Sequence, residues 1–243
     1  MGNWSVEERQ AQLDELREAW SVCENCQLCQ SRKNTVFGEG PADARIMLIG
    51  EAPNKEEDES GQPFDGDAGD LLNMLLDGAE IARNSIYLTT LVSCKPPETR
   101  QPLRDEKAAC WVRLAQQIYI VDPLVIVPVG KEALQTLVHG RSLDMKKSHG
   151  KLFGDAIKIP NPPCQMFPRK DDKKVEWSVA YDVIPIYHPS FALRIDSYDS
   201  DRDMWAQGSI ATLIRDDLCF IMDRVSRLSN IYDKSEMMFF QKE

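Results

Sequence analysis

The chain has 243 residues, 42% of them hydrophobic, which is enough for a core of ordinary size. Its formal net charge of −10 disfavours non-specific attraction to nucleic acid or to anionic membranes, although a local basic face is compatible with it. The N-terminal segment is polar and acidic, unlike a secretory signal, and no apolar run is long enough to span a membrane. We therefore expect one cytoplasmic domain over residues 1–243.

Apolar periodicity predicts alternating strands and helices. Strands are expected at residues 46–49, 86–92, 124–129 and 183–187, with a short one near 152–153 and 157–159, and helices at 4–22, 71–82, 108–121, 131–138 and 204–228. This alternation is typical of an α/β fold whose mostly parallel sheet is covered on both faces. The helices at 4–22 and 204–228 should pack on this body. Residues 160–182 combine prolines with a charged run, so we expect a loop insertion there.

Seven cysteines in a chain without a secretory signal favour metal ligation or free thiols over a disulfide framework. Cys23 and Cys26 form a C-x-x-C pair, and Cys29 follows three residues later. Cys94 and Cys110 supply a second, separated pair. Four such cysteines can hold zinc or an iron–sulphur cluster, and their spacing does not choose between the two. The structural alternative is a set of buried thiols without a metal.

The stretch 46–72 has the features of a ligand site at a sheet edge. Its apolar run ends at Gly50, and Glu51 follows where α/β folds place their ligands, beyond the carboxyl end of a strand. Phe64 then stands on a stiff, proline-preceded backbone before a glycine-rich segment. An aromatic ring beside a carboxylate can stack on a base. The alternative is a loop with a core phenylalanine and a solvated acidic run.

One histidine also stands at a strand end. His188 follows the expected strand 183–187 and precedes Pro189, which places it well to reach a cleft. The alternative is a structural histidine bonded to loop backbone. The chain has only three histidines, and the position of this one favours a functional role.

Five ordered motifs resemble the iron–sulphur-cluster, family-4-like branch of the uracil-DNA glycosylase superfamily. They are CENCQLCQSRKNTVFGEG at 23–40, GEAPNKEEDESGQPFDGDAG at 50–69, CKPPETRQP at 94–102, PLVIVPVGKEA at 123–133 and HPSFALR at 188–194. The resemblance implies a three-layer α/β/α sandwich with a central, mostly parallel four-stranded sheet. It also implies a DNA glycosylase that flips a pyrimidine out of DNA and hydrolyses its N-glycosidic bond, leaving an abasic site. We expect a monomer whose partner is DNA, with no membrane partner.

The same resemblance assigns a [4Fe–4S] cluster. Its ligands would be Cys23, Cys26, Cys94 and Cys110. Cys29 would be a bystander near the cluster, and Cys164 and Cys219 would be unrelated thiols.

The resemblance also assigns roles in catalysis and DNA binding. Phe64 would stack on the extruded base, and His188 would donate a hydrogen bond to the base oxygen on which negative charge develops. Glu51 would position the attacking water or stabilise the cationic sugar. Ser190 and Arg194 would contact the DNA backbone.

Three positions depart from the family pattern. Asn54 replaces a glycine, Asp65 replaces an aliphatic residue, and Thr90 replaces an asparagine that reads the uracil edge. If all three are base-binding residues, they predict a pocket retuned for a modified pyrimidine, for example a bulky or glucosylated one. Such bases occur in phage DNA, so anti-phage defence is one role that this pocket would suit. The alternative is neutral drift in a uracil enzyme.

Two other function classes compete with the glycosylase. One is a non-catalytic DNA-binding or scaffold member of the same fold, and the other is an unrelated α/β protein with a zinc site. A basic strip that could face DNA would comprise Lys95, Arg100, Arg104, Lys146, Lys147 and Arg194.

Overall fold

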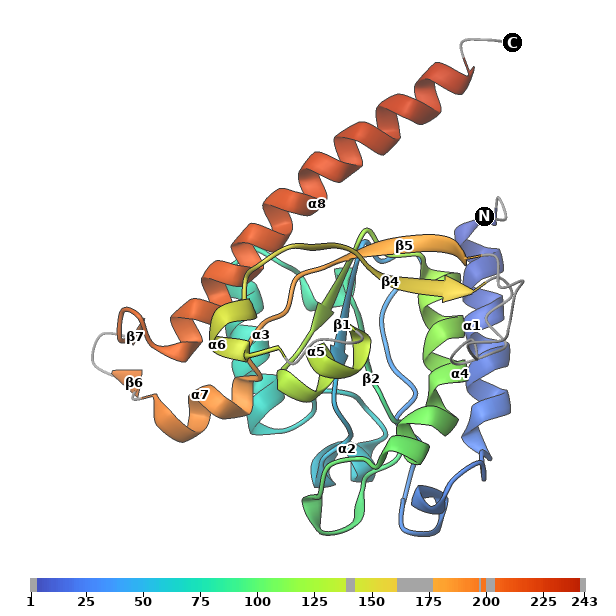
Figure 1. Cartoon of the computed structure of the whole chain (residues 1–243), viewed down its shortest axis with the longest axis vertical. Helices are drawn as coiled ribbons and strands as arrows, with labels where there is room; N and C mark the ends of the chain where they lie inside the picture. Colours follow the sequence, from blue (N-terminus) through green and yellow to red (C-terminus); the bar gives the residue numbers. More distant parts are fainter. Residues whose placement is uncertain (1–3, 139–142, 161–176, 197, 200–203, 241–243) are drawn as a thin grey trace.

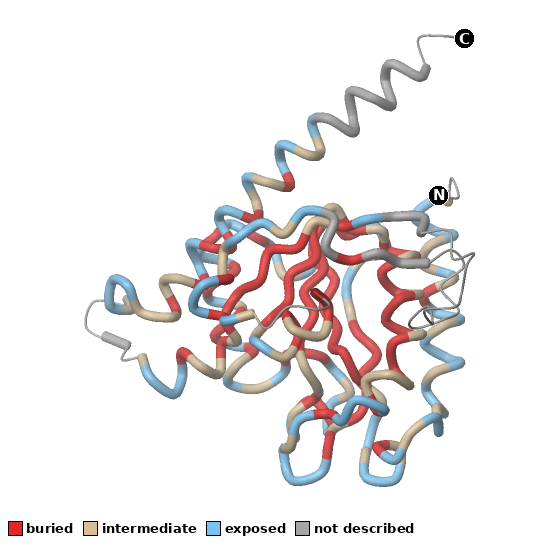
Figure 2. Tube along the Cα trace, viewed as in Figure 1, coloured by how far each residue is buried: buried red, intermediate tan, exposed pale blue. Residues whose placement is uncertain are grey.

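The computed structural model describes residues 4–138, 143–160, 177–196, 198–199 and 204–240 (Figure 1). Its centre is a five-stranded sheet in the order β2-β1-β3-β5-β4. The strands are β1 (Ile46–Gly50), β2 (Tyr87–Thr90), β3 (Val125–Pro128), β4 (Phe153–Pro160) and β5 (Trp177–Val183). Every residue of β1, β2 and β3 is buried, because both faces of the sheet are covered (Figure 2).

The sheet is mostly parallel, as expected. β1 pairs in parallel with β2 and β3, and β3 pairs in parallel with β5. The expectation of four strands is corrected, because β4 adds a fifth, antiparallel to β5. The expected loop insertion is also corrected at its end: β5 occupies Trp177–Val183, while residues 161–176 lie outside the described residues.

The strand expected at 183–187 forms only in part. Val183 ends β5, and beyond it Ile186 makes an isolated parallel bridge to Val129. Ile184 and Ile186 still donate to Ile126 O and Pro128 O at 3.1 and 3.0 Å, but Pro128 on β3 has no backbone N–H to donate in return, which interrupts the ladder. The chain still runs beside β3 here, and this places His188 next to the end of that strand.

Helices form the outer layers of the sandwich. They are α1 (Val6–Ser21), α2 (Lys55–Ser60), α3 (Asp67–Gly78), α4 (Arg104–Val121), α5 (Lys131–Leu137), α6 (Met145–Ser148), α7 (Pro189–Ile195) and α8 (Ile210–Phe240). Helix α1 packs on α4, while α3, α7 and α8 form a second group (Figure 1). Among the described helices, none has the length and apolar character needed to cross a membrane.

The C-terminal helix begins later than residue 204 and continues past 228. Met204–Trp205 forms the short strand β7, which pairs with β6 (Tyr198–Asp199). Gly208 then adopts a positive φ of 79°, and the Ser209 hydroxyl accepts a hydrogen bond from the Thr212 backbone N–H at 3.3 Å. Gly208 therefore turns the chain, and Ser209 caps the N-terminus of α8.

The outer edge of β2 is covered by an irregular segment. Val36 donates its backbone N–H to Ser93 O at 2.8 Å. Glu39 and Leu88 exchange both of their backbone hydrogen bonds, at 2.9 and 2.7 Å. This segment follows the loop that carries the first three cysteines, so that loop is tied directly to the edge of the sheet.

Candidate active site

A cleft of about 460 Å³ opens at the carboxyl ends of β1 and β3, and its volume lies in the range of ligand pockets. Five of the expected site residues line it: Glu51, Asn54, His188, Ser190 and Arg194. They come from the turn after β1 and from α7 together with its N-cap, His188. Segments far apart in the sequence therefore meet at one edge of the sheet.

Glu51 occupies a half-buried, acidic corner of the cleft. Burial raises the pKa of its carboxyl group, and the nearby Glu132 carboxylate raises it further. The Lys107 ammonium acts in the opposite direction, and it also forms an ion pair with Glu132 at 3.4 Å. Glu51 is thus partly desolvated but stays in contact with the space where a substrate would lie.

His188 has a defined tautomer. Its Nδ1 accepts a hydrogen bond from the Ser190 backbone N–H at 3.2 Å and lies 2.8 Å from the Ser190 hydroxyl oxygen. Because a backbone N–H can only donate, Nδ1 carries no proton, and the neutral ring holds its proton on Nε2. Burial, assisted by the charge of Arg194, lowers the pKa of His188 to about 4. The imidazole is therefore neutral at physiological pH and offers Nε2–H as a donor.

Phe64 lies beside His188 in a constrained conformation. The two ring centroids are 6.5 Å apart with 24° between the planes, a separation close to twice the rise of about 3.4 Å per stacked base. Phe64 is buried, and its backbone has a positive φ of 54°, which is rare for a bulky residue. A Cβ on Gly69 would lie 1.7 Å from Phe64 O, so only glycine permits this close approach.

Glu57, which sequence reasoning missed, holds the Phe64 loop. Its carboxylate accepts hydrogen bonds from the backbone N–H groups of Phe64 and Asn54, the latter at 2.6 Å. Asn54 in turn caps α2 by accepting from Glu57 N at 2.8 Å. The Asn-x-x-Glu spacing is a capping-box signal that could have identified this pair. Asn54 thus lines the cleft while its side chain serves the loop.

Three residues expected in the pocket, Phe64, Thr90 and Asp65, are not among those that line the cleft. The Thr90 hydroxyl is buried and donates to Val92 O at 2.9 Å. A Cβ on Gly50 would come within 3.1 Å of the Phe64 ring and 3.3 Å of the Thr90 methyl group, so both side chains border Gly50. Asp65 is exposed, and its carboxylate accepts from Gly66 N.

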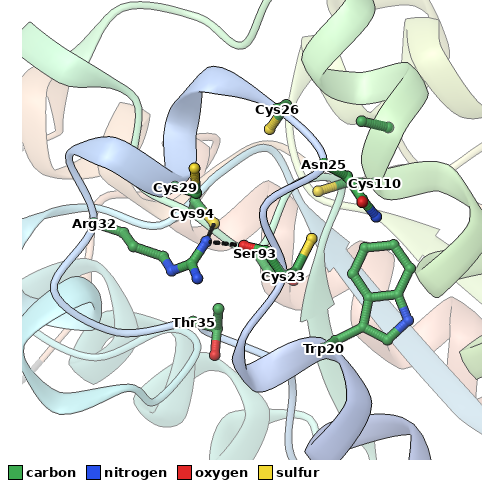
Figure 3. A pocket seen from close by; sticks show the side chains of 11 residues that line it. Trp20, Cys23, Asn25, Cys26, Cys29, Arg32, Thr35, Ser93, Cys94 and Cys110 are labelled. Atoms are coloured by element: carbon green, nitrogen blue, oxygen red, sulfur yellow. Dashed lines mark hydrogen bonds between the residues drawn. The ribbon is translucent and has the colours of Figure 1, made fainter.

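The cysteines surround a second cavity. Cys23, Cys26, Cys29, Cys94 and Cys110 all line it, and their side chains gather around it in Figure 3. Arg32 approaches Cys94 Sγ at 3.5 Å and donates to Cys23 O at 2.6 Å. Burial raises the pKa of Cys94 to about 11 and also raises those of Cys26 and Cys110. The sequence pairs are therefore brought together in space.

The family is decided by comparison with known proteins. The model of the uracil DNA glycosylase superfamily matches residues 37–207. The chain belongs to the uracil DNA glycosylase superfamily. It is 37% identical over 186 residues to the type-4 uracil-DNA glycosylase of Thermotoga maritima (76% of this chain, 85% of the relative). It is 36% identical over 185 residues to that of Saccharolobus solfataricus (74% and 77%) and 39% over 148 residues to that of Pyrobaculum aerophilum (60% and 76%).

These relatives confirm the resemblance to the family-4-like branch, and by family the chain is a DNA glycosylase. The basic strip expected in this glycosylase is assembled only in part. Arg100 and Arg194 line the cleft, joined by Lys131, which sequence reasoning did not single out. Arg100 is paired with Glu106 at 2.6 Å, and Arg194 lies 5.9 Å over the Phe191 ring. The other strip members, Lys95, Arg104, Lys146 and Lys147, are not among the residues that line the cleft.

The cysteine cavity of this superfamily member contains several thiols and one buried hydroxyl donor. Within the described part of the chain, no three histidine, cysteine or acidic side chains converge closely enough to share one metal ion. In a cubane cluster each thiolate binds its own iron, so the four sulphur atoms need not converge on a single ion. The Ser93 hydroxyl also lines the cavity, and it is buried without a hydrogen-bond partner among the described residues. Such a donor suits an anionic sulphur acceptor.

The buried carboxyl group of Glu57, which bonds to the Phe64 backbone, predicts that the free energy of unfolding depends on pH. Burial raises the pKa of Glu57 from 4.5 to about 7, so the folded state binds this proton more tightly than the unfolded chain does. Its contribution to the free energy of unfolding should fall as the pH rises through this window, by on the order of 3 kcal/mol. When the free energy of unfolding is measured in urea between pH 4.5 and 8, Glu57→Gln is expected to abolish this part of its pH dependence. Glu56→Gln, at an exposed neighbour, is the control, and equal pH slopes for parent and Glu57→Gln would contradict the prediction.

Proposed function

We propose that the protein is a uracil-DNA glycosylase, which flips uracil out of DNA and hydrolyses its N-glycosidic bond. One observation carries the proposal: a neutral His188 with its proton on Nε2 shares a cleft with a half-buried carboxylate, Glu51. The names of the type-4 relatives support the same activity. The Phe64 ring, 6.5 Å from the His188 ring and tilted 24° to it, would supply an aromatic face for the extruded base.

In this proposal His188 acts as a neutral hydrogen-bond donor. As the bond from the base to C1′ breaks, negative charge grows on the pyrimidine oxygen, and Nε2–H is aimed at it. Ser190 keeps Nδ1 occupied as an acceptor, so the ring does not need to change tautomer during the reaction. A fixed donor in a water-poor site stabilises developing charge without reorganisation.

Glu51 serves the other partner of the breaking bond. The sugar gains positive charge as the base leaves, and a carboxylate beside it stabilises that charge and orients the attacking water. The raised pKa of Glu51 favours its accepting a proton from the water as the new C–O bond forms. The products are the free base and an abasic site.

The pocket residues support uracil over a modified pyrimidine. Thr90 uses its hydroxyl on Val92 O, Asn54 caps α2, and Asp65 is exposed. Thr90 and Asn54 thus have structural uses in this chain, and Asp65 is not among the residues that line the cleft. The names of the relatives also point to uracil. Action as a monomer in the cytoplasm stays a prediction from the sequence.

A [4Fe–4S] cluster held by Cys23, Cys26, Cys94 and Cys110 is part of the proposal. The support is the shared cavity and the donor set of four thiols, with Cys29 left outside the set. Once bound, the cluster would cross-link the loop after α1 to the end of β2 and to α4. The residues that line the base cleft at Pro96, Thr99 and Arg100 follow Cys94 directly, so this cross-link would order one wall of the cleft.

Base release tests the function. DNA oligonucleotides that carry uracil, thymine, 5-hydroxymethylcytosine or glucosylated 5-hydroxymethylcytosine are incubated with the protein, and the free bases are measured by mass spectrometry. We expect uracil alone to be released, and Glu51→Gln to slow its release by about 10²–10⁴-fold. Release of a modified pyrimidine with uracil spared would overturn the choice of base. No release from any DNA would favour the non-catalytic DNA-binding alternative.

A further inference from the structure

Arg113 is a cation enclosed entirely in the protein interior. It lies on α4, and no part of its side chain is exposed. Its guanidinium group donates to Phe37 O (3.0 Å), Thr89 Oγ1 (3.0 Å), Gln117 Oε1 (2.6 Å), Thr90 O (2.6 Å) and Leu91 O (3.3 Å). All of these acceptors are neutral. None of these partners is a carboxylate, and the Nε atom of Arg113 has no hydrogen-bond partner among the described residues.

A charge in such a place needs an anion. Transfer of an ionised group into the interior is costly unless an opposite charge lies near, and neutral acceptors compensate only in part. The free Nε proton shows that even the hydrogen bonding is incomplete. The interior around Arg113 therefore has an uncompensated positive charge.

The thiols of the cysteine cavity are the groups that can supply the missing charge. Cys110 stands one helical turn before Arg113 on α4, and residues three apart share a helix face. The carbonyls of Thr90 and Leu91, which Arg113 binds, lie just before Cys94 in the chain. Cys110 and Cys94 thus belong to the two segments that hold the Arg113 guanidinium group, and thiolates at these positions would favour its charged form. Tyr87, the other acidic group near it, stays neutral because burial raises its pKa to about 12.

We propose that Arg113 is the buried counter-ion of the iron–sulphur cluster, whose four thiolates make it an anion; the inference rests on the cluster proposed above. Arg32 approaches Cys94 from the partly exposed side of the cavity, and Arg113 supplies positive charge from the interior. Net charge and hydrogen bonding around a cluster set its reduction potential and its retention. Arg113 would raise the potential, because a nearby cation stabilises the more negative, reduced cluster.

The test separates charge from hydrogen bonding. Arg113→Gln removes the charge and keeps some donors, whereas Arg113→Lys keeps the charge and loses the planar fork. Gln117→Leu is the matched control, since it cuts the same buried network without changing its charge. Circular dichroism checks the folding of each variant. The cluster's visible absorbance is then followed in a redox titration and during bleaching by a chelator.

We expect Arg113→Gln to shift the reduction potential to more negative values and to bleach about 10–100-fold faster than the parent. Arg113→Lys and Gln117→Leu should stay within about threefold of the parent bleaching rate, well below that outer-shell effect. Should Arg113→Gln match the Gln117→Leu control, or should Arg113→Lys shift as far as Arg113→Gln, the counter-ion role is wrong while the cluster stands. A folded parent protein without iron would instead overturn the cluster itself. Base release from the uracil oligonucleotide reports separately on the proposed catalytic site.

Discussion

Replacement of His188 by alanine is expected to lower single-turnover excision of uracil by about 10²–10³-fold, the usual effect of losing one donor to a developing oxyanion. The loss follows from the removal of Nε2–H, the donor that the Ser190 N–H fixes by occupying Nδ1. Helix α7 also loses its N-cap, so we expect the free energy of unfolding to fall by about 1 kcal/mol. The fold should therefore persist while the chemistry fails.

The control for this variant is His149→Ala, which removes the other described histidine. His149 pairs with Asp217 at 2.9 Å and is not among the residues that line the cleft. We expect its loss to leave excision within about threefold of the parent, far from the 10²-fold effect of a catalytic donor. If His188→Ala cleaves at the parent rate, or if both variants lose activity equally, the assignment of His188 is wrong.

Replacement of Cys94 by serine should lower the melting temperature far more than replacement of Cys219. Cys94 is buried in the cysteine cavity, whereas Cys219 is exposed on α8. A ligand lost from a structural metal site removes several kcal/mol of folding free energy, and each kcal/mol is about 2–4 °C for a chain of this size. We expect a fall of more than about 10 °C for Cys94→Ser and about 1 °C or less for Cys219→Ser.

A second pair of variants sits within one loop. Cys26 is an expected cluster ligand, and Cys29, three residues later, is an expected bystander, although both line the cavity. Cys26→Ser should lose bound iron and visible absorbance, and Cys29→Ser should keep both. Retention of iron in Cys26→Ser together with its loss in Cys29→Ser would reassign the ligand set.

The parallel core of the sheet was predictable because its strands are continuous apolar runs. Residues 46–49 and 124–129 anticipated β1 and β3 to within one or two residues, since strands buried on both faces need no alternation. The β4–β5 pair was harder to predict. Prolines and charges around residues 160–182 dominate the local pattern, and the antiparallel partner is fixed by tertiary packing rather than by a short turn.

Of the candidate site, the residues at strand ends were predictable and those that support them were not. Glu51 and His188 follow strand-like runs, and the structure brings both to one cleft. Glu57 belongs to an acidic run, a pattern that predicts solvent exposure unless Glu57 is recognised as the capping-box partner of Asn54. Arg113 was missed because α4 is buried around most of its circumference, so helical periodicity gives no sign of which polar side chain lies inside.

The cover over β2 links the cysteine loop to the risk of aggregation. An uncovered edge strand offers its N–H and C=O groups to another chain. Here the segment from Val36 to Glu39 occupies that edge. It starts only four residues after Arg32, so a loss of order in the cysteine loop would weaken its hold on β2. Oxidative damage to the thiols should therefore loosen this cover as well as the cleft wall that follows Cys94, and self-association through β2 would accompany the loss of the site.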